Sequence, residues 1–201
     1  MHISDGVLSG PVCIGSSVVA AALIAYSLKK MENEEIPGIA VMTAAFFVAS
    51  LIHIKIGPTS THLVLNGLVG IILGISAIPA ILVALLFHAL MFQHGGITTL
   101  GVNSLAMSVP ALISFGIFKS AKFIKSKSKF VTSLFSFISG SLAIIFSSIF
   151  TSLFLITAGQ EFLETAKIVL VINAPIAIIE GFITLFVVSF LQRVKPDMIN
   201  L

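Results

Sequence analysis

A succession of apolar stretches, each close to the length of a membrane-spanning helix, constrains this chain more than any other feature. A helix needs about 20 mostly apolar residues to cross a bilayer. The stretches that fit this template are roughly 11–29, 36–55, 62–77, 78–93, 98–118, 130–157 and 166–192. Only 9% of the residues are charged, against about 25% in a soluble domain, so the chain cannot cover a soluble surface. The sequence predicts an all-α fold, a polytopic membrane helix bundle of about seven transmembrane helices forming one domain, residues 1–201.

The positions of lysine and arginine predict how this bundle is oriented. Cytoplasmic loops carry an excess of these residues. With seven spans, one side of the membrane receives nine of the 11: Lys29, Lys30, Lys119, Lys122, Lys125, Lys127, Lys129, Arg193 and Lys195. Only Lys55 and Lys167 fall on the other side, and with six spans this separation is lost. We therefore expect the N-terminus outside and the C-terminus in the cytoplasm of a multi-pass protein of the cell (inner) membrane.

Composition excludes several other classes of site and partner. The single cysteine, Cys13, rules out an internal disulfide and a cysteine-based zinc cluster, and we interpret it as a small apolar residue in a helix. The net charge of +3 reflects cations at one membrane face, so the expected partner is the lipid bilayer and no nucleic acid. The first residues lack the basic start and short apolar core of a cleaved signal, so the mature chain is expected to begin at Met1.

The histidines gather on the side of the membrane away from most lysines. His2 is predicted at the N-terminus, and His53 and His62 near the ends of spans. His94 is predicted in the loop after the fourth span and His88 two turns inside that span. Neutral imidazole is the commonest protein ligand for transition metals, so this distribution indicates a metal site. A single histidine at a helix end is more often bonded to backbone, and we give His53 and His88 that interpretation.

His2 has a further property because it is the second residue. A free amine at Met1, the amide nitrogen of residue 2 and the His2 imidazole can form fused five- and six-membered chelate rings. One more imidazole completes a near-planar site of four nitrogens, which suits Ni²⁺ or Cu²⁺. This chemistry is possible for any chain that begins Met-His and does not by itself require a metal.

Turn signals and irregular segments predict a pocket at the outer end of the bundle. Asp5-Gly6 and Ser9-Gly10-Pro11 favour turns, so residues 1–10 are expected to fold back into this pocket. The segments 57–61 and 93–103 read as irregular, and hydroxyls of the first could cap a helix or orient His62. Glu180, near the middle of the last span, is either a functional intramembrane carboxylate or a hydrogen-bonded group that orders helix packing.

Four short sequences, in order along the chain, resemble the CbiM/NikM family, the substrate-binding subunits of cobalt and nickel energy-coupling-factor transporters. Residues 1–8, MHISDGVL, resemble the family opening MHIPDG(F/Y)L. Residues 58–63, PTSTHL, resemble its GTSxH element, and residues 92–103, FQHGGITTLGVN, resemble F-x-(D/H)-G-G-(I/L)-T-x-(I/L)-G-A-N. Residues 174–182, APIAIIEGF, resemble xPxAIxEG of the last family helix. The likeness runs from Met1 to about Pro196.

The resemblance implies a ligand set and partners. It implies that Co²⁺ or Ni²⁺ is transported and is held by Met1, His2 and His62, with support from Ser60, Thr61, His94 and Asn103. It also implies a transmembrane coupling subunit and cytoplasmic ATPases, and leaves open a small accessory membrane subunit. The chain has no GxxxxGK(S/T) phosphate loop, so it is expected not to be an enzyme.

Three departures from the family pattern bear on the choice of metal. Ser4 stands in place of the usual Pro and Val102 in place of Ala, and neither is a ligand. His94 stands where nickel-type members often have Asp, which leans toward cobalt without separating the two ions.

Sequence reasoning thus favours the substrate-binding membrane subunit of an ATP-dependent cobalt and/or nickel importer. The alternative is a stand-alone secondary transition-metal transporter, a class that often shows inverted repeats, and none is evident here. An intramembrane metalloenzyme is a third reading, against which the sequence offers no HExxH pair.

Overall fold

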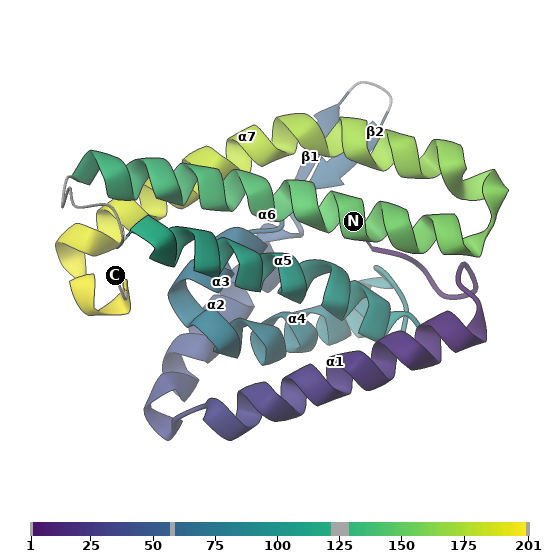
Figure 1. Ribbon diagram of the computed structural model, residues 1–201, viewed down its shortest axis with the longest axis horizontal. Helices are drawn as coiled ribbons and strands as arrows, with labels where there is room; N and C mark the ends of the chain where they lie inside the picture. Colours follow the sequence, from purple (N-terminus) through teal and green to yellow (C-terminus); the bar gives the residue numbers. More distant parts are fainter. Residues whose placement is uncertain (1, 57–58, 122–128, 200–201) are drawn as a thin grey trace.

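The computed structural model describes residues 2–56, 59–121 and 129–199, with the backbone course alone for 53–56, 59–61 and 129. Helices make up most of the described chain (Figure 1). They are α1 (Gly10–Lys30), α2 (Ile36–Ala49), α3 (Asn66–Leu73), α4 (Ala77–Phe92), α5 (Leu100–Ser120), α6 (Lys129–Ala158) and α7 (Leu163–Val194). The other described elements are two short strands, β1 (His53–Ile56) and β2 (Thr59–His62), and the short 3-10 helices η1 (Asn33–Glu35), η2 (Gly74–Ser76), η4 (Gln160–Phe162) and η5 (Pro196–Met198).

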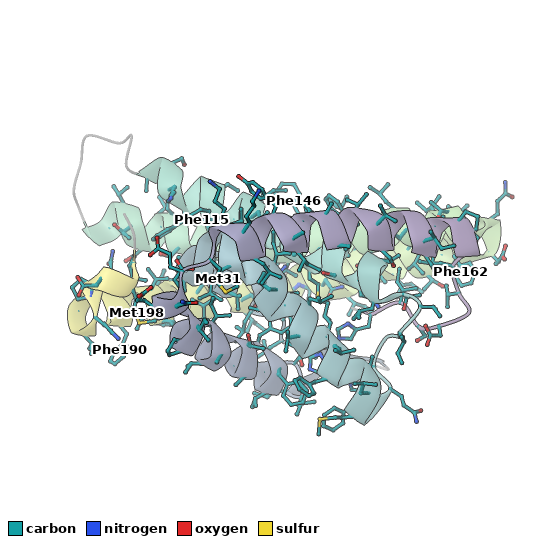
Figure 2. The ribbon with its side chains drawn as sticks, turned by 90° about the horizontal axis from the view of Figure 1, so that it is seen from below. Met31, Phe115, Phe146, Phe162, Phe190 and Met198 are labelled. Atoms are coloured by element: carbon teal, nitrogen blue, oxygen red, sulfur yellow. The ribbon has the colours of Figure 1, made fainter. Side chains whose placement is uncertain are left out.

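Five stretches are long and apolar enough to cross a membrane. They are Gly10–Lys30, Asn66–Phe92, Leu100–Ser120, Phe130–Ala158 and Gln160–Val194. Large apolar side chains such as Val18, Phe186 and Phe190 face outward from these helices, and Figure 2 shows such side chains along the length of the bundle. The prediction of a multi-pass helical membrane protein is confirmed.

The second and third predicted spans differ from the structure. Helix α2 ends at Ala49, so the predicted span 36–55 is helical only in its first part. Strands β1 and β2 then pair antiparallel, with His53 opposite His62, and α3 begins at Asn66, later than the predicted span 62–77. The physical reason is local: Ile54 and Ile56 alternate with Lys55, a pattern of period two that favours a strand.

A sharp turn joins α3 to α4 at one end of the bundle. Gly74 has φ +56°, a left-handed backbone conformation that glycine adopts without a steric penalty. The Ser27 hydroxyl donates to the Ile75 carbonyl at 2.9 Å, and the Ser76 hydroxyl donates to Glu35 at 3.0 Å. The turn η2 (Gly74–Ser76) therefore lies beside the end of α1 and the start of α2.

The same end of the bundle holds a cavity of about 640 Å³. Its lining includes Lys30 at the end of α1, Gly74, Lys119 at the end of α5, and Lys195 after α7. Met31 and Met198 lie toward this end in Figure 2 and Phe162 toward the other. Helix α3 thus arrives at this end and α4 leaves it.

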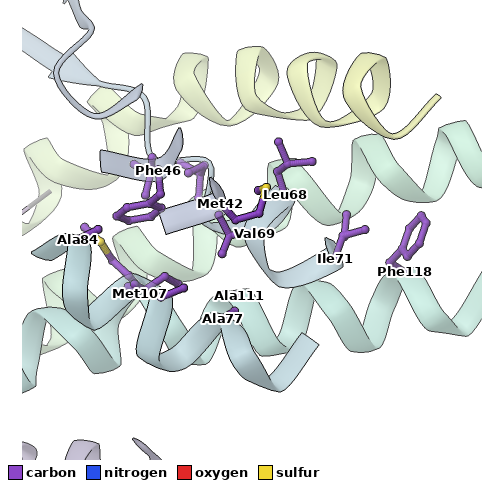
Figure 3. Packing of buried hydrophobic residues seen from close by; sticks show 14 of the residues in the cluster. Met42, Phe46, Leu68, Val69, Ile71, Ala77, Ala84, Met107, Ala111 and Phe118 are labelled. Carbon is purple, nitrogen blue, oxygen red and sulfur yellow. The ribbon is translucent and has the colours of Figure 1, made fainter. Parts of the chain in front are cut away.

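The main core lies between α2, α3, α4 and α5 (Figure 3). Phe46, Val69, Ile81 and Met107 are buried there. Gly70 of α3 packs directly on the backbone of Ala111 in α5, where an added Cβ would lie 2.1 Å from the carbonyl oxygen. Close helix approach in membranes uses small residues in this way, and it holds α3 deep inside the bundle.

Candidate metal centre

The first residues of the chain turn back into the bundle and are held there by Asn103. The Ile3 amide donates to Asn103 Oδ1 at 2.9 Å, and Asn103 Nδ2 donates to the Ile3 carbonyl at 2.9 Å. The Thr99 hydroxyl donates to the same carbonyl at 2.7 Å. Asn103 is buried, so these bonds fix the backbone next to His2 in a protected place.

A second set of bonds holds the turn at Asp5. Its carboxylate accepts from the amides of Ile97 and Thr98, at 3.1 and 2.9 Å, and from the Thr98 hydroxyl. The Thr98 hydroxyl bond, with the backbone amides adding, holds the pKa of the Asp5 carboxyl below its ordinary value. Gly96 permits this approach, since a Cβ there would lie 2.0 Å from Asp5 Oδ1. Residues far apart in sequence thus fix the N-terminal segment at two points.

The fixed segment places His2 among three other imidazole rings. The centre of the His2 ring lies 5.0 Å from that of His62, in a stacked arrangement, and 5.5 Å from that of His88. The ring of His94 lies 6.4 Å from that of His2 and 6.5 Å from that of His88. His62 and His88 are buried, whereas His94 is half-buried. Side chains from the N-terminus, β2, α4 and the loop after α4 therefore meet.

The environment of His2 keeps its ring neutral. Burial lowers the pKa of the His2 imidazole well below its ordinary value, and the neighbouring imidazoles add to this effect. Neither ring nitrogen has a hydrogen-bond partner in the described part of the chain. A buried polar atom normally has a partner, so two such nitrogens on one ring are unusual. A neutral imidazole with an available lone pair is the form that binds a metal ion.

The separations between the rings are compatible with one shared ion, although the side chains alone do not form a complete site. Two imidazoles bound to the same ion at about 2.1 Å have ring centres roughly 4.5 to 6.5 Å apart. Within residues 2–56, 59–121 and 129–199, however, no group of three His, Cys, Asp or Glu side chains could hold a metal ion. A complete site would therefore need donors of another kind as well, such as nitrogens of the N-terminal backbone.

The structure describes only some of the other predicted site residues. Met1 lies outside the described residues, as do the side chains of Ser60, Thr61 and His53, whose backbone belongs to the two strands. His62 Nδ1 donates to the Leu63 carbonyl at 2.8 Å, and in this tautomer Nε2 carries the lone pair. The structure brings together His2, His62, His94 and Asn103, and the roles assigned to them remain predictions.

Glu180 lies apart from the histidine rings and contacts the segment that follows His62. Its carboxyl group accepts from the backbone amides of Val64 and Leu65, the latter at 3.0 and 2.9 Å from the two oxygens. Leu65 has φ +56°, which is uncommon for a residue with a branched side chain. Glu180 is buried, so α7 ties down the turn between His62 and α3.

Replacing this carboxyl group is expected to loosen both the fold and the histidine site. In Glu180→Gln the amide NH₂ faces backbone N–H donors, and one unmatched buried donor costs about 1–3 kcal/mol. We expect a lower unfolding midpoint in detergent and about tenfold weaker Ni²⁺ binding, because the segment after His62 loses one of the bonds that hold it in place, and lost support of a metal ligand typically costs about 10–100-fold. Glu164→Gln is the matched control, because Glu164 lies exposed on the same helix and forms a surface ion pair with Lys167. Wild-type stability and affinity in Glu180→Gln would contradict this role.

One residue of this cluster was not assigned to it from the sequence. His88 was interpreted as an ordinary histidine bonded to backbone, and its Nε2 does lie 3.1 Å from the Phe47 carbonyl. What the sequence did not indicate is that the same ring lies next to His2. The available signal was that His88 lies on the helix leading to His94, two turns inside the predicted outer pocket.

Comparison with known proteins places this arrangement among metal transporters. A family model described as "Cobalt uptake substrate-specific transmembrane region" (CbiM) matches residues 2–198. A cobalt transport protein CbiM of Kyrpidia tusciae is 30% identical over all of this chain and 86% of its own length. A cobalt transport protein CbiM of Lachnoclostridium phytofermentans is 28% identical over all of this chain and 85% of its own length.

A solved structure has the same fold. The crystal structure of a truncated transition metal transporter covers 96% of this chain and 99% of its own, with a TM-score of 0.73 and 23% identity.

Proposed function

Because the chain belongs to the family of cobalt uptake substrate-specific transmembrane regions, we propose that it is the substrate-binding membrane subunit of an ATP-dependent energy-coupling-factor importer for cobalt or nickel ions. One observation carries this proposal. The N-terminal segment is folded back so that the His2 ring stacks 5.0 Å from that of His62, and both of its nitrogens are buried without a hydrogen-bond partner among the described residues.

The donor atoms limit which metal ions the proposed site can bind. The amine of Met1, the amide and imidazole nitrogens of His2 and the imidazole of His62 supply four nitrogens. A six-membered ring that includes the His2 amide nitrogen can close only through Nδ1 of its imidazole. Nitrogen donors in a near-plane suit Ni²⁺ or Cu²⁺, whereas Mg²⁺ and Ca²⁺ prefer oxygen, and the family likeness narrows the proposed cargo to Co²⁺ or Ni²⁺. Binding displaces protons from the donors, so capture is favoured at neutral or higher pH.

The supporting residues act on these donors. Asn103 bonds both backbone groups of Ile3, and it therefore sets the position of the His2 amide. His94 lines the cluster at 6.4 Å from His2. Ser60 and Thr61, which precede His62 in β2, complete the proposed set on the basis of the family likeness.

The proposed topology has seven passes with the N-terminus outside and the C-terminus in the cytoplasm of the cell membrane. It is supported by the cavity that Lys30, Lys119 and Lys195 line with Gly74, because lysines mark the cytoplasmic side. Helices α2 and α3 each cover part of the membrane. Helix α2 starts at this end, α3 finishes at it, and the two strands connect them. Helix lengths alone count α3 and α4 as one span, but the turn at Gly74 reverses the chain between them.

Energy for uptake comes from partner subunits in this proposal. The sequence contains no GxxxxGK(S/T) phosphate loop, and such a loop is the usual means of holding ATP phosphates. A transmembrane coupling subunit and cytoplasmic ATPases are therefore the expected partners, with a small accessory membrane subunit as an addition.

Uptake of radioactive Co²⁺ or Ni²⁺ tests this function. We expect uptake in cells that produce the chain with its coupling and ATPase subunits. Replacing the phosphate-loop lysine of the ATPase should reduce this uptake to the background of cells without the chain. Full uptake by the chain alone, or with the inactive ATPase, would instead support the stand-alone secondary transporter.

A further inference from the structure

His88 has one ring nitrogen fully engaged and the other without a partner. The Ser50 hydroxyl donates to the Phe47 carbonyl at 2.7 Å, so its only proton is used. His88 Nε2 contacts both Ser50 Oγ and, at 3.1 Å, the Phe47 carbonyl oxygen. The carbonyl oxygen can only accept, and the Ser50 oxygen has already given its proton to Phe47, so Nε2 carries the proton of the neutral ring.

The tautomer of His88 leaves a buried acceptor. Nδ1 then holds the lone pair, and it has no hydrogen-bond partner within the described chain. The ring cannot readily turn away, because it is stacked on Phe47 at 4.8 Å with an interplanar angle of 18° and is completely buried. An unsatisfied buried acceptor is costly, so a donor is expected to reach Nδ1 when the protein works.

His2 carries the donor that fits. If Nδ1 of His2 closes the chelate ring, the proton of that imidazole lies on Nε2, which is also buried and unpartnered in this structure. An N–H···N bond of about 3 Å between two imidazoles puts their ring centres roughly 5 Å apart. The centres of the His2 and His88 rings are 5.5 Å apart with an interplanar angle of 53°, a separation close to the one that such a bond requires.

We propose that His88 is a positioning residue for the transported ion, whose Nδ1 accepts a hydrogen bond from His2 Nε2–H. This inference rests on the proposed function. The bond holds His2 in the tautomer whose Nδ1 faces the ion, and it connects the ion through two imidazoles to the Phe47 carbonyl. A metal-bound histidine commonly donates its other N–H to such a partner, which fixes the ring and makes it a stronger ligand.

Two substitutions of His88 test this role through the affinities for Ni²⁺ and Co²⁺. In His88→Phe the ring shape is kept and the acceptor is lost, so we expect binding about 10–100-fold weaker, the usual effect of losing such a partner. In His88→Gln the amide can accept from His2 and donate to Phe47, and it should recover most of the loss. Equal losses in the two variants, or wild-type affinity in His88→Phe, would overturn the proposal.

A measurement without metal separates this role from a purely structural one. ¹⁵N NMR of histidine-labelled protein should show His2 as the Nε2–H tautomer in the wild type and as a mixture in His88→Phe. An unchanged tautomer would overturn the proposal even if the affinity falls. Binding by His2→Ala decides the proposed site itself: affinity kept in His2→Ala defeats that site. Affinity lost in His2→Ala but kept in His88→Phe defeats only the role of His88.

Discussion

Adding two residues before Met1 is expected to weaken Ni²⁺ and Co²⁺ binding by roughly 1,000-fold, or about 4 kcal/mol. The extension turns the Met1 amine into a peptide amide, which binds a metal ion only after losing its proton, and it moves the free amine out of reach of a four-nitrogen site that ends at the His2 imidazole. His2→Ala should have an effect of similar size, because it removes the imidazole and with it the six-membered chelate ring.

The comparison needs chains that differ only at the N-terminus. Protein with the native start and protein with two extra glycines are titrated in detergent with Co²⁺ and Ni²⁺, both carrying their purification tag at the C-terminus. A chain with a longer C-terminal tag is the control and should bind as the native one does. Full affinity or full transport by the N-terminally extended chain would show that the amine is not a donor.

The second large effect is expected from His62→Ala, which should weaken binding by roughly 100-fold, or about 3 kcal/mol. His62 supplies the imidazole that stacks 5.0 Å from His2, and without it the fourth position passes to water or to a poorer donor. His53→Ala is the matched control. His53 pairs with His62 across the two strands through backbone groups, which alanine retains, so its loss should matter little.

The electronic spectrum of the Ni²⁺ complex gives a second reading of the same pair. Loss of one imidazole changes the ligand field, so the visible absorption of the complex should shift in His62→Ala and stay as in the wild type in His53→Ala. Equal losses of affinity and equal spectra in the two variants would mean that His62 is not the fourth donor.

The apolar stretches predicted a helical multi-pass membrane protein correctly, because the free energy of placing a segment in lipid is close to a sum over its residues. The same additivity explains the error at 36–55 and 62–77. Hydropathy does not distinguish a helix from a strand when both are apolar, and the chain after Ala49 forms β1 and β2. The predicted boundary between the third and fourth spans, at 77–78, lies close to the turn that the structure has at Gly74.

Motifs such as the N-terminal eight residues and the segment 92–103 carried the family assignment from sequence alone. They also pointed to His2, His62, His94 and Asn103, which the fold brings together. Their roles as ligands or supports await the measurements above.

The sequence by itself therefore determined that this is a membrane protein, that it is helical, and which family it belongs to, since each depends on properties read locally along the chain. Only the tertiary structure decided that His88 lies against His2. It also decided that Glu180 accepts from the amides that follow His62, of which that of Val64 is 116 residues away in sequence. The physical reason is that a polar pair inside a bundle forms where side chains from different helices meet. That meeting depends on the packing of the whole core, which no local pattern contains.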